Sequence, residues 1–168
     1  QLTQAARQMA AGELSSSTIP AAPDEIGQLA KAFNVMSIQL SEQINALQSE
    51  RAKLSAVLQK MNDGVIIVDR DGRIQLLNAA AQKMFALDQT TVIGLPLVEA
   101  THYHQLFEIW QRCQASGQGQ SDSFELGRQN LYLAAVATPL GPLLPGSTLM
   151  LFQDLTRPRQ IDAIRRDF

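Results

Sequence analysis

Apolar residues recur every three or four positions over residues 24–61, a stretch longer than a small globular domain needs. This repeat predicts one long amphipathic helix that pairs with other helices as a coiled coil. Arg51 fills the one position that the repeat skips. We interpret Arg51 as a polar residue with a function within the stripe. The alternative is that its side chain extends out of the stripe to solvent. The apolar stripe consists of Ile26, Leu29, Phe33, Met36, Leu40, Ile44, Leu47, Leu54, Leu58 and Met61.

The spacing within this stripe indicates a change of register. An unbroken seven-residue repeat would place Gln43 and Glu50 on the stripe, and Glu50 would then face its own copy in a parallel dimer. An extra four-residue step after Leu40 places Ile44 and Leu47 there instead. We therefore predict a stutter, which locally unwinds the supercoil.

The residues before the stripe predict a second, shorter helix and a linker. Residues 1–11 carry apolar side chains at helical spacing, and Gly12 is a stop signal. Residues 13–23 hold a Ser/Thr run and two prolines, which favour an extended linker. Its length allows the long helix to start parallel to the first one. Asp24 is the predicted N-cap, and Glu25 suits the positive end of the helix dipole.

After Gly64 the pattern changes to short strands separated by turns and helices. Asp71-Gly72 predicts a hairpin turn between strands at 65–68 and 73–77, and Asn78 predicts the cap of a short helix at 79–85. We expect loop and short helical turns at 88–101. A helix at 104–115 should follow, then strands at 122–126, 131–138 and 148–155, and a final helix from Arg157. This order predicts an α+β fold, with a five-stranded antiparallel sheet and helices over one face.

Composition excludes several classes of function. The formal charge of −2 gives no strong attraction to nucleic acid or to an anionic membrane. The single Cys113 excludes an intrachain disulfide and a cysteine zinc cluster. No apolar run is long enough to cross a bilayer, and the chain has no signal peptide and no initiator methionine. We expect a segment of a longer chain.

The sequence contains no recognisable catalytic set, and its binding candidates are weak. His102 and His104 form a His-x-His pair with the potential to ligate a metal or a haem. The pattern favours solvated rings at a helix start instead. We expect Cys113 to be a buried structural thiol. Aromatic residues between 103 and 110 are candidates to line a ligand cavity, although core packing is the more common role.

The first third of the chain resembles a HAMP domain. The supporting elements are the run Ala-Ala-Gly-Glu-Leu at 10–14, the run Asp-Glu-Ile-Gly-Gln-Leu at 24–29, and Ala32-Phe33-Asn34 with Met36. Residues from about 54 to 156 resemble a PAS domain. Here the support comes from Met61 with Asp63-Gly64-Val65, from Asp69 with Asp71-Gly72 and Ile74, from Asn78 with Ala80-Ala81, and from the run Gln-Asp-Leu-Thr at 153–156. The tail at 164–168 resembles the run before the phosphoacceptor histidine of sensor histidine kinases.

The resemblance implies a parallel helical HAMP bundle at 1–43, a coiled-coil signalling helix at 44–61, a PAS domain at 62–156 and the start of an output helix at 157–168. It implies no cofactor in this segment, and ATP with Mg²⁺ only for a kinase core that lies outside it. The implied relay residues are the stripe and Arg51, together with Glu25, Asp154, Thr156, Ile161, Ile164 and Phe168.

The implied function is signal relay in a homodimeric two-component sensor histidine kinase. The kinase would act on a response regulator, and this segment would be the cytoplasmic part of an inner-membrane protein, attached only through transmembrane helices outside these residues. Two alternatives remain open. The first is a PAS sensor that binds haem, flavin, a metal or a small molecule. The second is a HAMP–PAS input to a cyclase or chemoreceptor.

Overall fold

A computed structural model describes Thr3, Arg7 and residues 24–158 of the 168-residue chain. The chain divides into two compact units, Gln1–Ser55 and Ala56–Phe168, and each is described separately. The predicted linker at 13–23 and most of the predicted first helix lie outside the described residues. The final helix is described only at its first turn, where residues 156–158 are helical.

The predicted long helix is present as α2, Glu25–Lys60, a continuous helix of 36 residues. Its start is capped as expected, because the Asp24 carboxylate accepts a hydrogen bond from the Gly27 backbone N–H at 3.0 Å. The chain leaves the helix after Lys60 and enters the first strand at Gly64. A helix this long without proline agrees with the apolar repeat that predicted it.

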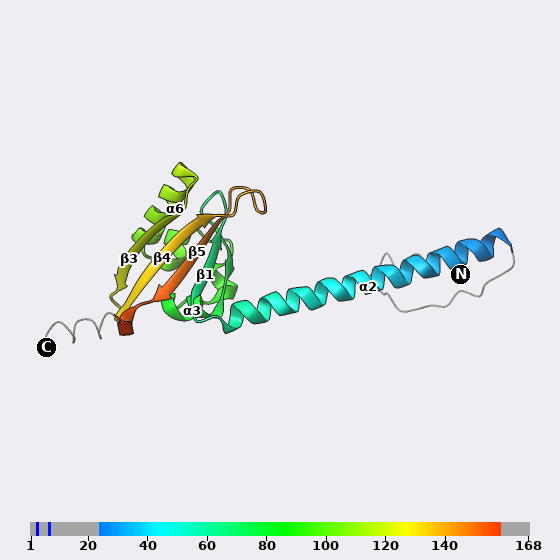
Figure 1. The fold of residues 1–168 in the computed structure, drawn as a ribbon, viewed down its shortest axis with the longest axis horizontal. Coiled ribbons are helices and arrows are strands. Elements are labelled where there is room, and N and C mark those ends of the chain that lie inside the picture. Colours follow the sequence, from blue (N-terminus) through cyan, green and yellow to red (C-terminus); the bar gives the residue numbers. More distant parts are fainter. Residues whose placement is uncertain (1–2, 4–6, 8–23, 159–168) are drawn as a thin grey trace. The chain divides into compact units, whose positions relative to one another are not determined.

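The second unit is an antiparallel five-stranded sheet with the order β2-β1-β5-β4-β3 (Figure 1). The hairpin of β1 (Gly64–Val68) and β2 (Ile74–Leu77) forms at the predicted turn. The other strands are β3 (Gln120–Leu126), β4 (Leu131–Pro139) and β5 (Thr148–Asp154), within two residues of their predicted bounds. The predicted α+β fold is confirmed.

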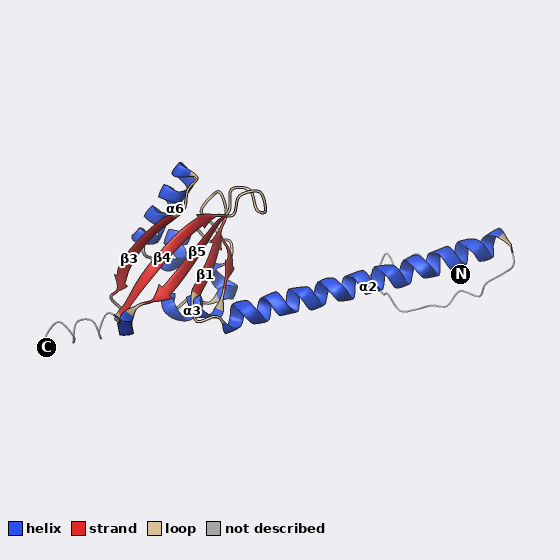
Figure 2. Ribbon diagram, viewed as in Figure 1, coloured by secondary structure: helices blue, strands red, loops and turns tan. Residues whose placement is uncertain are grey.

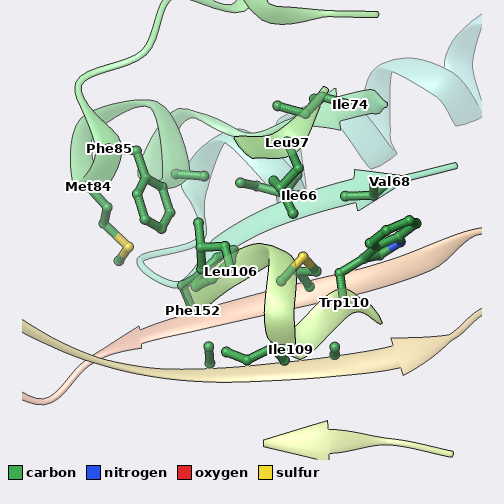
Figure 3. Close-up of a cluster of buried hydrophobic side chains, with 14 of the residues drawn as sticks. Ile66, Val68, Ile74, Met84, Phe85, Leu97, Leu106, Ile109, Trp110 and Phe152 are labelled. Carbon is green, nitrogen blue, oxygen red and sulfur yellow. The ribbon is translucent and has the colours of Figure 1, made fainter. Parts of the chain in front are cut away.

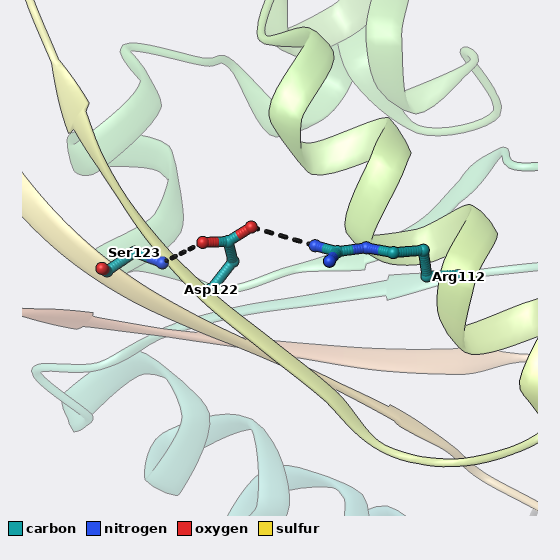
Figure 4. A network of polar contacts seen from close by, with 3 residues as sticks. All are labelled: Arg112, Asp122 and Ser123. Atoms are coloured by element: carbon teal, nitrogen blue, oxygen red, sulfur yellow. Dashed lines mark hydrogen bonds and ion pairs between the residues drawn. The ribbon is translucent and has the colours of Figure 1, made fainter.

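Four helices lie between β2 and β3 in the sequence. Figure 2 shows helices in blue beside the strands of the sheet in red. They are α3 (Ala79–Phe85), α4 (Gln89–Val92), α5 (Leu97–Thr101) and α6 (His104–Ser116). α3 contacts β1, while α6 contacts β3, β4 and β5. Helix α6 is also joined to β3 by an exposed ion pair of 2.9 Å between Arg112 and Asp122 (Figure 4).

The hydrophobic core fills the space between the sheet and these helices (Figure 3). Phe152 of β5 is fully buried and meets Phe85 of α3 edge to face, with ring centroids 4.9 Å apart. Along β4, Leu133, Ala135 and Ala137 are buried, while the residues between them are more exposed. This alternation shows that only one face of the sheet packs on the core.

Candidate functional site at the two helix junctions

The stripe on α2 is largely uncovered in the single chain. Six of its members are between 42% and 68% exposed, and the polar positions Glu25 and Arg51 are exposed as well. The remaining members, Phe33, Ile44, Leu58 and Met61, are half-buried. Large apolar side chains in a continuous exposed row are typical of a surface that meets another protein surface. The six exposed members are Ile26, Leu29, Met36, Leu40, Leu47 and Leu54.

Asn78 ties the end of α2 to the sheet, at a place that we name the incoming junction. Its side chain is buried, and its amide nitrogen donates to the backbone carbonyls of Leu58 and Asp63 at 3.0 and 2.9 Å. Its amide oxygen accepts from the backbone N–H groups of Val65 and Ala81 at 2.8 and 2.9 Å. One side chain therefore connects the last turns of α2, the start of β1 and the first turn of α3.

The sequence predicted Asn78 only as a helix cap, and the cap is confirmed. Its contact with the end of α2 was not predicted, because the acceptor is a backbone carbonyl 20 residues earlier. The residue type itself was consistent with a second contact beyond the cap. Among common N-cap residues, Asn both accepts and donates through its side chain, whereas Asp only accepts.

Asp154 and Thr156 form a second connection, the outgoing junction, where β5 ends and the final helix begins. The Asp154 carboxylate accepts hydrogen bonds from the backbone N–H and the hydroxyl of Thr156. The Thr156 oxygen in turn accepts from the Tyr132 N–H at 2.9 Å, and the Leu155 N–H donates to the Tyr132 carbonyl at 2.8 Å. The start of the final helix is thus attached to β4 as well as to β5.

The sheet places the two junctions next to each other. β1 pairs with β5 in antiparallel register, so Gly64 at the start of β1 lies opposite Phe152 near the end of β5. A cleft of about 450 Å³ is lined from both sides, by residues 59–62 at the end of α2 and just beyond it, and by Asp154. Lys83 of α3 and Leu131 of β4 complete part of its wall. The structure therefore brings together residues that the sequence separates by about ninety positions. The other predicted relay residues, Ile161, Ile164 and Phe168, lie outside the described residues.

The two histidines are both exposed and belong to the ends of different helices. His102 is exposed and ends α5, whereas exposed His104 begins α6 and lies 3.5 Å from Glu108. Within the part of the chain that the structure describes, no group of three or more His, Cys, Asp or Glu side chains is placed to hold a metal. Phe107 packs between His104 and Trp110, with ring centroids 6.0 and 5.4 Å away.

Cys113 is fully buried on the inner face of α6, as expected for a structural thiol. Burial raises the pKa of this thiol, because the thiolate would lose its hydration, although a hydrogen bond with Thr148 opposes the shift. A thiol with a raised pKa is a weak nucleophile at neutral pH. Trp110 is also buried and belongs to the same core cluster.

Comparison with known proteins agrees with this architecture. The PAS fold family model matches residues 52–136, and the HAMP domain model matches residues 1–42. The chain belongs to the PAS fold family, and it carries a HAMP domain before the PAS domain. The predicted order of a HAMP domain followed by a PAS domain is confirmed.

The chain is 31% identical over 150 residues to the sensor protein kinase WalK of Staphylococcus aureus strain Newman. The match covers 86% of this chain but only 24% of that relative. A second WalK sequence from Staphylococcus aureus is 30% identical, with 35% of its length covered. The chain therefore spans about a quarter to a third of these relatives.

Two solved structures share the fold. The PAS domain of Bordetella pertussis BvgS has a TM-score of 0.54 at 15% identity, covering 73% of this chain and 95% of that domain. A PAS domain from Colwellia psychrerythraea has a TM-score of 0.50 at 13% identity, covering 66% and 98%. At these identities the likeness concerns the fold alone. Within the described residues, no helix is long and apolar enough to span a membrane.

Proposed function

We propose that this chain is the signal-relay segment of a homodimeric sensor histidine kinase. The observation that carries the proposal is the adjacency of the incoming and outgoing junctions at one end of the sheet, where β1 begins and β5 ends. Similarity to sensor protein kinases over 86% of the chain supports the same role. The kinase core, with its ATP and Mg²⁺, and a response regulator as partner belong to parts of the system outside these residues. The segment itself uses no cofactor in this proposal.

The proposed dimer forms through the stripe on α2. Its exposed leucines and isoleucine bury apolar surface only when a second helix covers them, and a parallel pairing gives both copies the same register. Transmembrane helices outside these residues would deliver the signal, which makes this segment the cytoplasmic part of a membrane protein. Arg51 is the one polar position of the stripe, and a polar residue in a helix–helix interface helps to select the register in which the two helices pair.

The relay step is a change at the incoming junction that alters the outgoing one. A rotation or shift of the last turns of α2 displaces the Leu58 carbonyl, which Asn78 holds. Asn78 also holds the start of β1, and β1 is hydrogen-bonded to β5, which ends at Asp154. Coupling between two sites requires such a connected element with two arrangements.

Light scattering on the purified 168-residue chain tests the dimer. Met36 and Ile38 are 54% and 56% exposed on the same helix, but Ile38 lies roughly 160° from the centre of the stripe at 100° per residue. Met36→Asp should convert the dimer to monomer, whereas Ile38→Asp should leave it dimeric. A parent chain that is monomeric at micromolar concentration would contradict the proposal.

Autophosphorylation of the intact kinase in membranes tests the relay. Asn78→Ser removes the bonds to the end of α2, and Thr156→Val removes the bond to β4. Each should change kinase activity by about fivefold or more, since coupling free energies commonly reach 1–3 kcal/mol. Thr138→Val, at an exposed position of β4, is the control and should have no effect. Unchanged activity in both junction variants would rule out a relay through this unit.

A further inference from the structure

A second cleft of about 610 Å³ lies away from the two junctions. Three segments line it: residues 85–87 at the end of α3, residues 100–103 from the end of α5 to the start of α6, and residues 127–129 in the turn between β3 and β4. Its volume falls within the range of about 300–1,000 Å³ typical of small-molecule sites. None of its lining residues belongs to either helix junction.

The lining combines an apolar wall with a few polar groups. Phe85, Leu87 and Ala100 supply apolar surface, and the ring of Tyr103 packs on Phe85 with centroids 6.1 Å apart. Arg128 is the only lining residue with a permanent charge. Within the described residues, neither the Arg128 guanidinium nor the Tyr103 hydroxyl has a hydrogen-bond or ion-pair partner. The lining thus carries one positive charge, on the exposed Arg128, and these two donor groups have no protein partner among the described residues.

The backbone around the cleft is held in an uncommon conformation. Ala86 and His102 both line it and both have positive φ, at 52° and 61°. They end α3 and α5 in the left-handed conformation that glycine usually supplies, and a side chain there costs about 1–2 kcal/mol. The Gln129 amide, oriented to donate, lies 2.9 Å from the Met84 carbonyl and so ties the β3–β4 turn to the end of α3. The three walls thus have a defined geometry.

We propose that this cleft binds a small organic carboxylate with an aromatic or branched apolar body. The Arg128 guanidinium matches a carboxylate through two parallel hydrogen bonds, and the Tyr103 hydroxyl adds a third donor. The apolar body of the ligand covers Phe85, Leu87 and Ala100. An inorganic anion would satisfy the charge but would leave this apolar wall in contact with water, so it should bind more weakly.

Amide NMR titration of the 168-residue chain tests the site, with phenylacetate as the probe. Phenylacetate should shift the amides of residues 100–103 and 127–129 saturably. Two control compounds separate the contribution of the ligand's charge from that of its ring. The compound 2-phenylethanol keeps the ring without the charge, and inorganic phosphate keeps the charge without the ring. Both controls should bind more weakly by about tenfold or more, the loss expected for one charge-assisted bond or one buried ring.

Three variants make the test specific. Arg128→Gln should weaken phenylacetate binding by about tenfold or more. Arg70→Gln, at an exposed arginine of the β1–β2 turn, should leave it unchanged. Gly127→Leu adds bulk at a lining residue and should weaken binding, and its Cβ has room because no atom lies within 4 Å of that position.

Three results would overturn the proposal: no shifts at the cleft, equal binding of phenylacetate and phosphate, or full affinity in Arg128→Gln. The measurement reports on the cleft alone. It therefore stands or falls independently of the proposed dimer and relay.

Discussion

Large apolar side chains are exposed along the helix α2 but buried in the sheet unit. In the sheet unit, Ile66, Leu106 and Phe152 are fully buried within the single chain. On α2, Leu47 and Leu54 are 68% and 67% exposed, although they belong to an equally regular apolar pattern. The sheet unit therefore completes a core of its own, whereas the apolar stripe on α2 stays largely exposed among the described residues, as expected for the proposed dimer surface. The stability of the two regions should therefore depend differently on protein concentration.

The largest effect is expected in the core of the sheet unit. Phe152→Ala removes a fully buried ring together with its edge-to-face contact with Phe85, and should lower the free energy of unfolding by about 3–5 kcal/mol. Urea unfolding followed by circular dichroism measures this loss. The loss should be the same at two protein concentrations, because the core lies within one chain. A cost below about 1 kcal/mol would show that the core can repack.

The incoming junction should rank second. Asn78→Ala leaves backbone groups of four residues without their partner, two of them buried and two half-buried, and should cost about 2–3 kcal/mol. Asn78→Ser keeps an oxygen to cap α3 and should recover about 1 kcal/mol of that loss. The same urea titration compares the two variants. If Asn78→Ser regains full stability, the bonds to the end of α2 contribute nothing.

The stripe on α2 allows a test of the helix register, with a smaller expected effect. Two neighbouring substitutions should have different outcomes, and these outcomes should be exchanged if the register is wrong. With the predicted stutter, Arg51 lies on the stripe and Glu50 does not. Arg51→Leu should then strengthen the dimer by about 1–2 kcal/mol, because it buries a leucine in the seam, and Glu50→Leu should have little effect. Sedimentation equilibrium measures both dissociation constants. The opposite result would establish an unbroken seven-residue repeat.

The smallest effect concerns pH and the ion pair on the surface of α6. The Ser123 backbone N–H, and secondarily Arg112, hold the pKa of the Asp122 carboxyl below its ordinary value of 3.8 (Figure 4). Because the folded pKa is lowered, the stabilisation is present above the unfolded pKa and is lost as pH falls through the folded pKa. The pair is half exposed, so solvent screening keeps this contribution small.

NMR titration of the Asp122 side chain checks this sign. In Arg112→Gln the pKa of Asp122 should rise only part of the way to 3.8, since the larger contribution from Ser123 remains. An Asp122 that titrates at its ordinary value in the parent chain would contradict the prediction.

Local patterns were sufficient for most elements of the fold. The repeat predicted α2, Asp71-Gly72 predicted the β1–β2 hairpin, and Asn78 predicted the start of α3. Each of these depends on residues within a few positions of one another. The stutter, the dimer seam and the domain bounds remain predictions from the sequence.

The sequence by itself determined which segments are helix and strand, and that α2 carries a long apolar stripe along one side. Only the tertiary structure decided that β1 pairs with β5, and hence that Asn78 and Asp154 serve neighbouring junctions. It also decided that three segments far apart in the sequence line the cleft that includes Arg128. The physical reason is that periodicity and capping act within a few residues, whereas these contacts join backbone and side chains tens of residues apart through the packed sheet.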